Sequence, residues 1–247
     1  MNWKLIISPK TAGDSNMQTD LDLFRQFETS PLLSILRIYA WKPKCISLGY
    51  GQKIEDEIKL AEAKATGWDI VKRPTGGGIV FHNEAEVTYS LITAIDNPLL
   101  PRGMIHSYKK ISEALIDGLA LIGIKAELKS KKFEHRTSHT VPAGRQVEHR
   151  TLNTGLCFSY PAEYEVVVKG KKIVGSAQKR GRRALLQQGS IFVRNTDPAV
   201  FSLLKKPAEA YNAISVEELL RREIGFNEMS QALIKGFEEC FNIKLKS

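Results

Sequence analysis

The chain contains few cysteines and no long apolar run. Its three cysteines, Cys45, Cys157 and Cys240, lie far apart in the 247 residues and lack the close spacing of metal ligands. They cannot all pair as disulfides, so the sequence favours a reduced, cytoplasmic setting. No segment approaches the roughly 18 apolar residues that a membrane span needs, and the first residues do not resemble a secretory signal. We therefore expect neither a disulfide-rich secreted protein nor an integral membrane protein.

Acidic and aromatic residues are missing from one stretch of the chain. Between Lys169 and Arg183 there are seven basic residues and no acidic ones, within a sequence whose 36 basic and 27 acidic residues leave a net charge of +9. Such an excess suits an acidic partner, whether nucleic acid, anionic lipid or an acidic protein. The missing aromatic side chains argue against stacking on nucleic-acid bases, and a solvated basic face is the simpler alternative.

Short apolar segments alternate with helical patterns along a chain of ordinary globular composition, with 43% hydrophobic and 26% charged residues. A capping box beginning at Ser15 predicts one helix, and further helices are expected over 55–65 and along the stripe 108–122. The tight turn 169–171 predicts a hairpin. Strands are expected at 3–7, 35–41, 45–48, 69–72, 79–82, 87–91, 164–168, 172–174 and 190–193.

The last fifty residues are expected to be mainly helical. Asp197-Pro198 has an N-cap signature, Ser215 begins a second capping box, and Cys240 ends an apolar stripe as a small core residue. No linker divides the chain. The sequence thus predicts a single α+β domain over 1–247, in which a largely antiparallel mixed sheet is flanked by helices.

One tetrapeptide occurs twice in the sequence. Glu134-His135-Arg136-Thr137 recurs as Glu148-His149-Arg150-Thr151, and the spacer between the two copies has no apolar periodicity. Two copies do not make a solenoid. We interpret 133–151 as a surface-loop insertion, and its histidines are poor candidates for catalysis or metal binding.

A run of three glycines stands between two expected strands. Arg73-Pro74-Thr75-Gly76-Gly77-Gly78 would let a ligand approach bare backbone, although a flexible hairpin turn explains the glycines equally well. The spacing matches neither a Walker loop nor a dinucleotide fingerprint. His82 follows, where it would either orient a ligand or make a structural hydrogen bond.

A second group of small residues follows a lysine. Gly175, Ser176 and Ala177 come shortly after Lys172, and Cys157 stands fifteen residues before that lysine. A cysteine beside apolar residues is more often buried and inert. A nearby ammonium would instead lower its pKa and stabilise the thiolate.

These motifs together resemble the biotin/lipoate protein ligase superfamily. The resemblance is carried by the Arg73–Gly78 run with His82, by Gly170–Gln178 and by Gln188-Gly189-Ser190, and it runs from about Trp3 to Leu245. Within the superfamily, Cys157-Phe158 ahead of the 164–168 strand resembles the LipM-type octanoyltransferases of lipoate assembly. The resemblance implies a catalytic domain of the biotin/lipoate protein ligase type.

The resemblance also implies acyl transfer without a cofactor or metal. Octanoyl would arrive on acyl carrier protein, pass to Cys157 as a thioester, and end as an amide on a lysine of an apo lipoyl domain or glycine cleavage H protein. Lys172 would keep Cys157 ionised. The substrate-binding residues would be Arg73, Thr75, Gly76, Gly77, Gly78, His82, Gly175, Ser176, Ala177 and Gly189. Neither nucleic acid nor a membrane is an expected partner.

Two alternatives remain at this point. An ATP-dependent lipoate ligase would use Lys172 for an acyl-adenylate and leave Cys157 as a bystander. A nucleic-acid-binding module is suggested only by the basic charge, and the absence of a basic helix or an aromatic-rich strand weighs against it.

Overall fold

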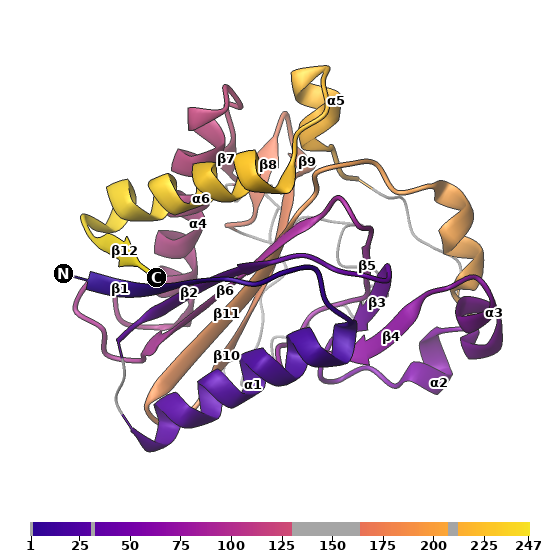
Figure 1. The fold of residues 1–247 in the computed structure, drawn as a ribbon, viewed down its shortest axis with the longest axis horizontal. Coiled ribbons are helices and arrows are strands. Elements are labelled where there is room, and N and C mark those ends of the chain that lie inside the picture. The colour runs from indigo at the N-terminus through magenta and orange to yellow at the C-terminus, as the bar shows by residue number, and fades with distance from the viewer. Residues whose placement is uncertain (1, 31–32, 130–163, 207–211) are drawn as a thin grey trace, which may run out of the picture.

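The computed structural model describes residues 2–30, 33–129, 164–206 and 212–247 (Figure 1). Its main element is a six-stranded sheet with the order β10-β11-β6-β2-β1-β12. Neighbours are antiparallel from β10 to β2, while β1 pairs in parallel with both β2 and β12. The strands are β1 (Asn2–Ile7), β2 (Ile35–Tyr39), β6 (Val87–Ala94), β10 (Val174–Arg180), β11 (Ala184–Ile191) and β12 (Lys244–Lys246). The predicted α+β fold with a largely antiparallel mixed sheet is confirmed.

Two small sheets flank the main one. The first has the order β4-β3-β5, with β3 (Cys45–Leu48) parallel to β4 (Asp69–Lys72) and antiparallel to β5 (Val80–His82). The glycine run therefore crosses over the end of β3, and the hairpin-turn interpretation of it is wrong. The second contains β7 (Glu127–Leu128), β8 (Val166–Val168) and β9 (Lys171–Lys172).

The predicted hairpin between β8 and β9 is confirmed. Val168 pairs with Lys171, so the loop holds only Lys169 and Gly170, with φ of 50° and 76°. Two consecutive positive φ values are the signature of a type I′ turn, whose twist matches that of the strands.

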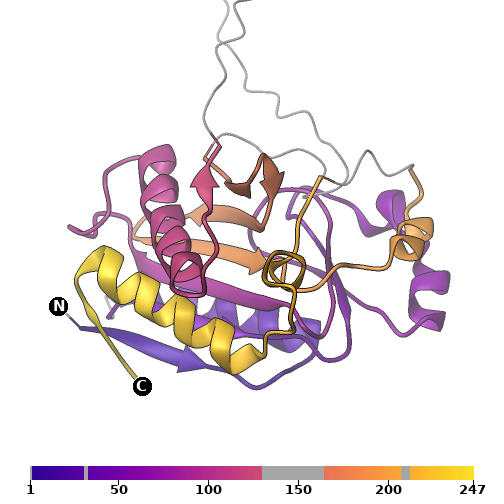
Figure 2. The same ribbon diagram turned by 90° about the horizontal axis from the view of Figure 1, so that it is seen from above.

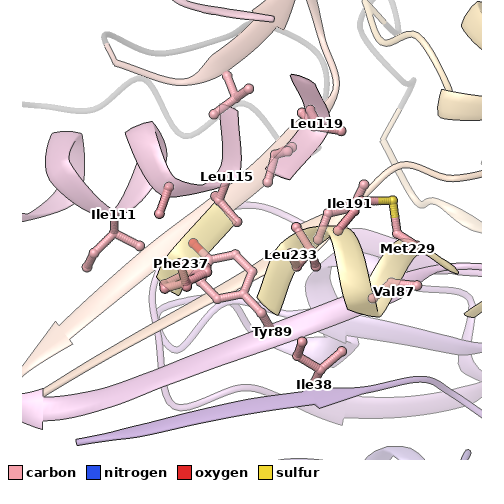
Figure 3. Packing of buried hydrophobic residues seen from close by; sticks show 14 of the residues in the cluster. Ile38, Val87, Tyr89, Ile111, Leu115, Leu119, Ile191, Met229, Leu233 and Phe237 are labelled. Atoms are coloured by element: carbon pink, nitrogen blue, oxygen red, sulfur yellow. The ribbon is translucent and has the colours of Figure 1, made fainter. Parts of the chain in front are cut away.

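Helices cover both faces of the six-stranded sheet. In Figure 1, α4 (Met104–Leu121) and α6 (Phe226–Phe241) lie above it and α1 (Gly13–Thr29) lies below; Figure 2 shows α4 and α6 together over the sheet. The upper face is apolar, with Leu115, Leu233 and Phe237 packed against Ile38 and Tyr89 (Figure 3). The two helices approach closely at glycines, because a Cβ on Gly236 would lie 2.3 Å from the backbone nitrogen of Gly118.

The expected capping box at Ser15 is wrong. The helix begins at Gly13. Its N-cap residue is Ala12, whose side chain makes no capping hydrogen bond. Asp69 of β4 takes that role, because its Oδ2 accepts a 2.9 Å hydrogen bond from the Gly13 backbone N–H. A carboxylate at a helix N-terminus satisfies a free donor and complements the helix dipole.

The single polar helix expected over 55–65 is also wrong. Two short helices, α2 (Ile54–Glu57) and α3 (Leu60–Ala65), are separated by Ile58, which is buried and forms a bridge with Leu204. We attribute the break to Ile58, whose side chain is buried when the backbone leaves the helix and pairs with Leu204. Of the short strand expected at 190–193, only Ser190 and Ile191 are in a strand, as the end of β11, which pairs with β10 along seven residues.

The caps expected near the C-terminal end are confirmed. Asp197 accepts a hydrogen bond from Ala199 N–H at the start of the 3₁₀ helix η1 (Pro198–Leu203), and Ser215 accepts one from Glu218 N–H at the start of α5 (Val216–Leu220). The stripe that includes Cys240 lies on α6, and that cysteine packs against the apolar core. The duplicated tetrapeptide and the insertion proposed at 133–151 lie outside the described residues. Within the described ranges, no helix is both long and apolar enough to cross a bilayer.

Candidate active site

The lower face of the sheet, beneath which α1 lies, carries buried polar groups. Asp20 of α1 is fully buried and accepts hydrogen bonds from Arg37 Nη1 at 2.7 Å, Tyr39 Oη at 2.9 Å and Ser90 Oγ at 2.5 Å. It also accepts one from Gln188 Nε2 at 2.7 Å. Alternation along the strands puts these side chains on the α1 face, beside a smaller apolar cluster that includes Phe24 and Ile92, and puts the main apolar core on the other face. This network fixes the strands that form the floor of a cavity.

That cavity is here called the central pocket. Its wall combines apolar side chains with a few polar groups, as is typical of a site for a small ligand. The residues that line it are Met17, Tyr39, Trp41, Ser47, Arg73, Val80, His82, Thr88, Gly175, Ser176, Ala177, Gln188, Gly189 and Ser190. Six of the ten predicted substrate-binding residues are therefore brought together here, from β5, β10, β11 and the glycine loop.

Arg73 holds the glycine loop in place. Its guanidinium donates to the carbonyl oxygens of Gly76 at 2.8 Å, Gly78 at 2.6 Å and Ser47 at 3.0 Å. Gly77 has a φ of +91°, a left-handed conformation that favours glycine. The loop also packs tightly, because a Cβ on Gly49 would lie 2.0 Å from the Gly77 carbonyl oxygen. The glycine loop therefore has a fixed conformation. Gly76, Gly77 and Gly78 do not line the pocket, and the loop instead supports Arg73, which does.

Thr75 and Gln188 join the glycine loop to the sheet. Thr75 Oγ1 donates to Gln188 Oε1 at 2.8 Å, while Gln188 Nε2 donates to Asp20 and lies 3.6 Å from the sulfur of Met17. The amide of Gln188 thus connects the loop, the polar network and α1. Thr75 is buried and does not line the pocket, so its contribution is to position Gln188.

His82 is a buried imidazole whose Nδ1 lies 3.3 Å from Oε1 of the buried Glu86. Burial, together with the positive charge of Arg73, holds the pKa of its imidazole well below the usual range. Its Nε2 lies 2.7 Å from Ser47 Oγ, its Nδ1 lies 3.3 Å from Ser190 Oγ, and its ring stacks on Trp41 with centroids 4.0 Å apart. His82 therefore makes the structural hydrogen bonds expected as one alternative, and it also lines the pocket; that it orients a ligand stays a prediction.

Small residues of β10 and β11 line one side of the pocket. Gly189 pairs with Ser176 across the two strands, and a Cβ there would lie 2.3 Å from the ring of Tyr89 and 2.4 Å from Ser176 Oγ. Gly175 and Ala177 lie on either side of Ser176 and contribute little bulk. A larger side chain at Gly189 would displace its neighbours.

Lys172 lies on β9, two residues before β10 begins, and is 1% exposed. Its Nζ donates to Glu165 Oε1 at 2.5 Å, so its charge faces a carboxylate. It does not line the central pocket. Cys157 lies outside the described residues, and the predicted pairing of Lys172 with Cys157 stays a prediction.

The two cysteines that the structure describes are poor nucleophiles. Burial raises the pKa of the Cys45 thiol well above its ordinary value, and nearby Asp69 adds to the effect. Burial also raises the pKa of the Cys240 thiol, which lies on the far side of the sheet with α6. Both therefore stay protonated near neutral pH.

Sequence reasoning missed several residues of the site. Gln188 stands in a quoted motif, but its role depends on contacts with Thr75 and Asp20 that are more than a hundred residues distant. Met17 and Trp41 look like ordinary core residues in the sequence. Glu165 could have been found, because the two-residue turn pairs Val167 with Lys172 and leaves Glu165 two positions away on the same face.

Comparison with known proteins identifies the family. Residues 13–238 match the lipoyl protein ligase A/B catalytic domain. Proteins named octanoyltransferase LipM are 32% identical in Anoxybacillus flavithermus and 34% identical in Geobacillus kaustophilus, over 99% of this chain and 88% of each relative. The protein named octanoyltransferase LipM in Clostridioides difficile is 34% identical over 98% of this chain and 88% of its own length.

Solved structures share the fold at lower identity. A lipoate-protein ligase A bound with ATP superimposes with a TM-score of 0.74 and 21% identity, covering 100% of this chain and 88% of the other. The bi-partite lipoate protein ligase of Thermoplasma acidophilum gives a TM-score of 0.73 at 22% identity, covering 100% and 86%. The resemblance inferred from the motifs is confirmed, and the chain belongs to the lipoyl protein ligase A/B catalytic-domain family.

Proposed function

We propose that this acyltransferase moves an octanoyl group from octanoyl-acyl carrier protein to a lysine of an apo lipoyl domain or glycine cleavage H protein, by way of a thioester on Cys157. Octanoyl transfer itself is the activity for which the relatives at 32–34% identity are named. The observation that carries the proposal is the central pocket. It is narrow, largely apolar and bounded by the backbone of Gly175–Ala177, which suits an unbranched alkyl chain.

The proposed chemistry balances in two steps. The Cys157 thiolate attacks the carbonyl carbon of the incoming thioester, a new C–S bond forms, and the carrier leaves as a thiolate that takes up a proton. The neutral amine of the acceptor lysine then attacks the enzyme thioester, forms the amide, gives up a proton and releases the Cys157 thiolate. Both steps start from an activated acyl group, so no nucleotide is consumed, and covalent capture divides one transfer into two easier ones.

Lys172 and Glu165 are the proposed electrostatic partners of that cysteine. A buried ammonium favours a nearby thiolate over the thiol, while the carboxylate at 2.5 Å limits this effect by partly neutralising the ammonium. Glu165 also keeps Lys172 from being an unpaired buried charge. We therefore assign Lys172 to charge stabilisation and Glu165 to positioning that ammonium.

The basic end of the β10–β11 hairpin is the proposed region for steering acidic carrier and acceptor domains. Arg182 and Arg183 are exposed in the hairpin turn, and Lys179 and Arg180 are half-buried at the end of β10. Long-range attraction of this kind raises association rates and falls with added salt.

ATP dependence distinguishes the proposal from a lipoate ligase. Purified protein is mixed with octanoyl-acyl carrier protein and an apo lipoyl acceptor, and the acceptor mass is followed with and without ATP. We expect transfer at equal rates in both, and none by Cys157→Ala. If Cys157→Ala octanoylates the acceptor from ATP and free octanoate, the chain is a ligase and the thioester proposal is wrong.

A further inference from the structure

A second hollow lies beside the central pocket. This outer groove is open, and its lining includes Leu21 and Arg25 of α1, the exposed Tyr50, and Lys179 of β10. The two hollows share only two lining residues, Met17 and Arg73. Those two side chains are therefore the partition between the central pocket and the outer groove.

The two residues of the partition differ in how firmly they are held. Arg73 is tied to three backbone carbonyl oxygens on two segments and cannot move without breaking the glycine loop. Met17 is an unbranched side chain, 7% exposed, and Gln188 Nε2 approaches its sulfur to 3.6 Å. The volume of the Met17 side chain, rather than any hydrogen bond that it makes, separates the pocket from the groove on this side.

The strand β10 gives the direction in which an acyl chain would lie. Lys172 stands just before β10, Gly175–Ala177 line the pocket, and Lys179 lines the outer groove. At about 3.3 Å per residue, Lys172 and Lys179 are separated by roughly 23 Å of extended chain. In Figure 1, β10 runs from the side of β9 toward α1. A chain whose carbonyl lies near Lys172 and which follows β10 therefore reaches Gly175–Ala177, and Met17 lines the pocket together with them.

We infer that Met17 sets the length of the acyl chain that this enzyme transfers. The inference rests on the proposed function and names its substrate class, saturated acyl groups of about the length of octanoyl. A smaller side chain at 17 would join the pocket to the outer groove, so that a longer chain could extend past α1. A larger side chain would shorten the pocket.

The test compares donors that differ only in acyl length. Hexanoyl, octanoyl, decanoyl and dodecanoyl thioesters of one acyl carrier protein are supplied to the parent, Met17→Ala and Met17→Phe, and kcat/KM is measured for each by the mass of the acceptor. Each methylene in such a pocket changes kcat/KM by about tenfold or more. We expect Met17→Ala to raise the decanoyl-to-octanoyl ratio about tenfold, and Met17→Phe to lower the octanoyl-to-hexanoyl ratio by a similar factor.

Leu21→Ala is the matched control, because Leu21 lies one turn further along α1 and lines the outer groove but not the central pocket. Its ratios should equal those of the parent. An active parent whose ratios do not change in Met17→Ala and Met17→Phe, or a change as large in Leu21→Ala, would overturn the inference. The two Met17 variants change the pocket in opposite directions, so a general loss of stability cannot imitate the expected result. A parent that transfers no acyl group at all would overturn the proposed function and this inference with it.

Discussion

The two faces of the six-stranded sheet are built on different principles. On the face covered by α4 and α6, strand residues such as Leu36, Ile38 and Leu91 join one continuous apolar cluster. On the face covered by α1, a smaller apolar cluster that includes Phe24 and Ile92 lies beside a polar network, in which Arg37 and Ser90 bond to Asp20. Period-two alternation along the same strands separates the two environments.

The difference shows what each face contributes. Apolar packing is non-directional and supplies most of the free energy of folding. A buried polar network contributes less net free energy, but it holds donors and acceptors in defined directions. The central pocket lies on the polar face, where Gln188 and Tyr39 both bond to Asp20 and both line the wall. The site is therefore built on the face whose geometry is fixed by bonds.

Removing the centre of the polar network should have the largest effect on stability. Asp20→Ala leaves the Arg37 guanidinium buried without its carboxylate and Tyr39, Ser90 and Gln188 without their acceptor. Breaking a buried ion pair on one side costs about 3–5 kcal/mol in the free energy of unfolding. Denaturant titration measures it. Asp22→Ala on the same helix removes an exposed carboxylate 3.7 Å from Arg25, and should cost about 0–1 kcal/mol. Equal losses in both variants would contradict the special role of the polar face.

The apolar face should be most sensitive where α4 and α6 touch. A Cβ on Gly236 would lie 2.3 Å from Gly118 N and 2.5 Å from the Ala114 carbonyl oxygen, and backbone atoms cannot yield as a flexible side chain would. Gly236→Ala should therefore lower the free energy of unfolding by about 1–3 kcal/mol, in spite of alanine's better helix propensity. Gly51→Ala, whose new Cβ would have no atom within 4 Å, is the control and should be nearly neutral. A stabilised Gly236→Ala would show that the helices can move apart freely.

His82 should make the free energy of unfolding depend on pH. Because burial and Arg73 lower its pKa in the folded state, the unfolded chain takes up a proton below about pH 6.5 that the folded chain does not. Stability from this group is thus present above that pH and is lost as the pH falls, by about 1.4 kcal/mol per pH unit at most. Unfolding free energies from pH 7.5 to 5 measure the slope. His82→Gln should show a shallower loss than the parent, and His106→Gln, which keeps His82, is the control. Identical slopes in His82→Gln and the parent would contradict the assignment.

The smallest expected effect is on the titration of one thiol. Lys172→Ala should raise the pKa of Cys157, because an ammonium that favours the thiolate is lost. Glu165→Gln should lower it, since the same ammonium is no longer neutralised by the carboxylate at 2.5 Å. The pH dependence of iodoacetamide alkylation at Cys157 measures both. If the pKa of Cys157 shifted in the same direction in both variants, the proposed electrostatic coupling of Cys157 to the Lys172–Glu165 pair would be wrong.

Local chemistry was predictable from the sequence, and contacts between distant segments were not. The β8–β9 turn follows from a lysine-glycine pair between apolar strands, and α4 follows from an apolar stripe of helical period. The capping box expected at Ser15 is wrong because the side chain that caps α1, Asp69, comes from a strand 56 residues away. The glycine run was open to a hairpin interpretation because the sequence does not reveal that β3 lies between β4 and β5.

The site shows the same limit. Arg73, His82, Gly175, Ser176, Ala177 and Gly189 were all expected near the substrate and all line the central pocket. That set follows from motifs, in which several glycines and a basic residue stand close together in the chain. Met17 and Gln188 carry no such local signature. Their roles come from a partition and a network that exist only when α1, the glycine loop and β11 are assembled.

The most direct measurement of the central claim uses the donor alone. The protein is incubated with octanoyl-acyl carrier protein without nucleotide or acceptor, and its intact mass is recorded before and after neutral hydroxylamine, which cleaves thioesters. The account predicts one octanoyl group per chain, mapped to Cys157 and removed by hydroxylamine, in the parent and equally in Cys45→Ala and Cys240→Ala. An active enzyme that forms no such adduct, or that carries it on another residue, would contradict the account.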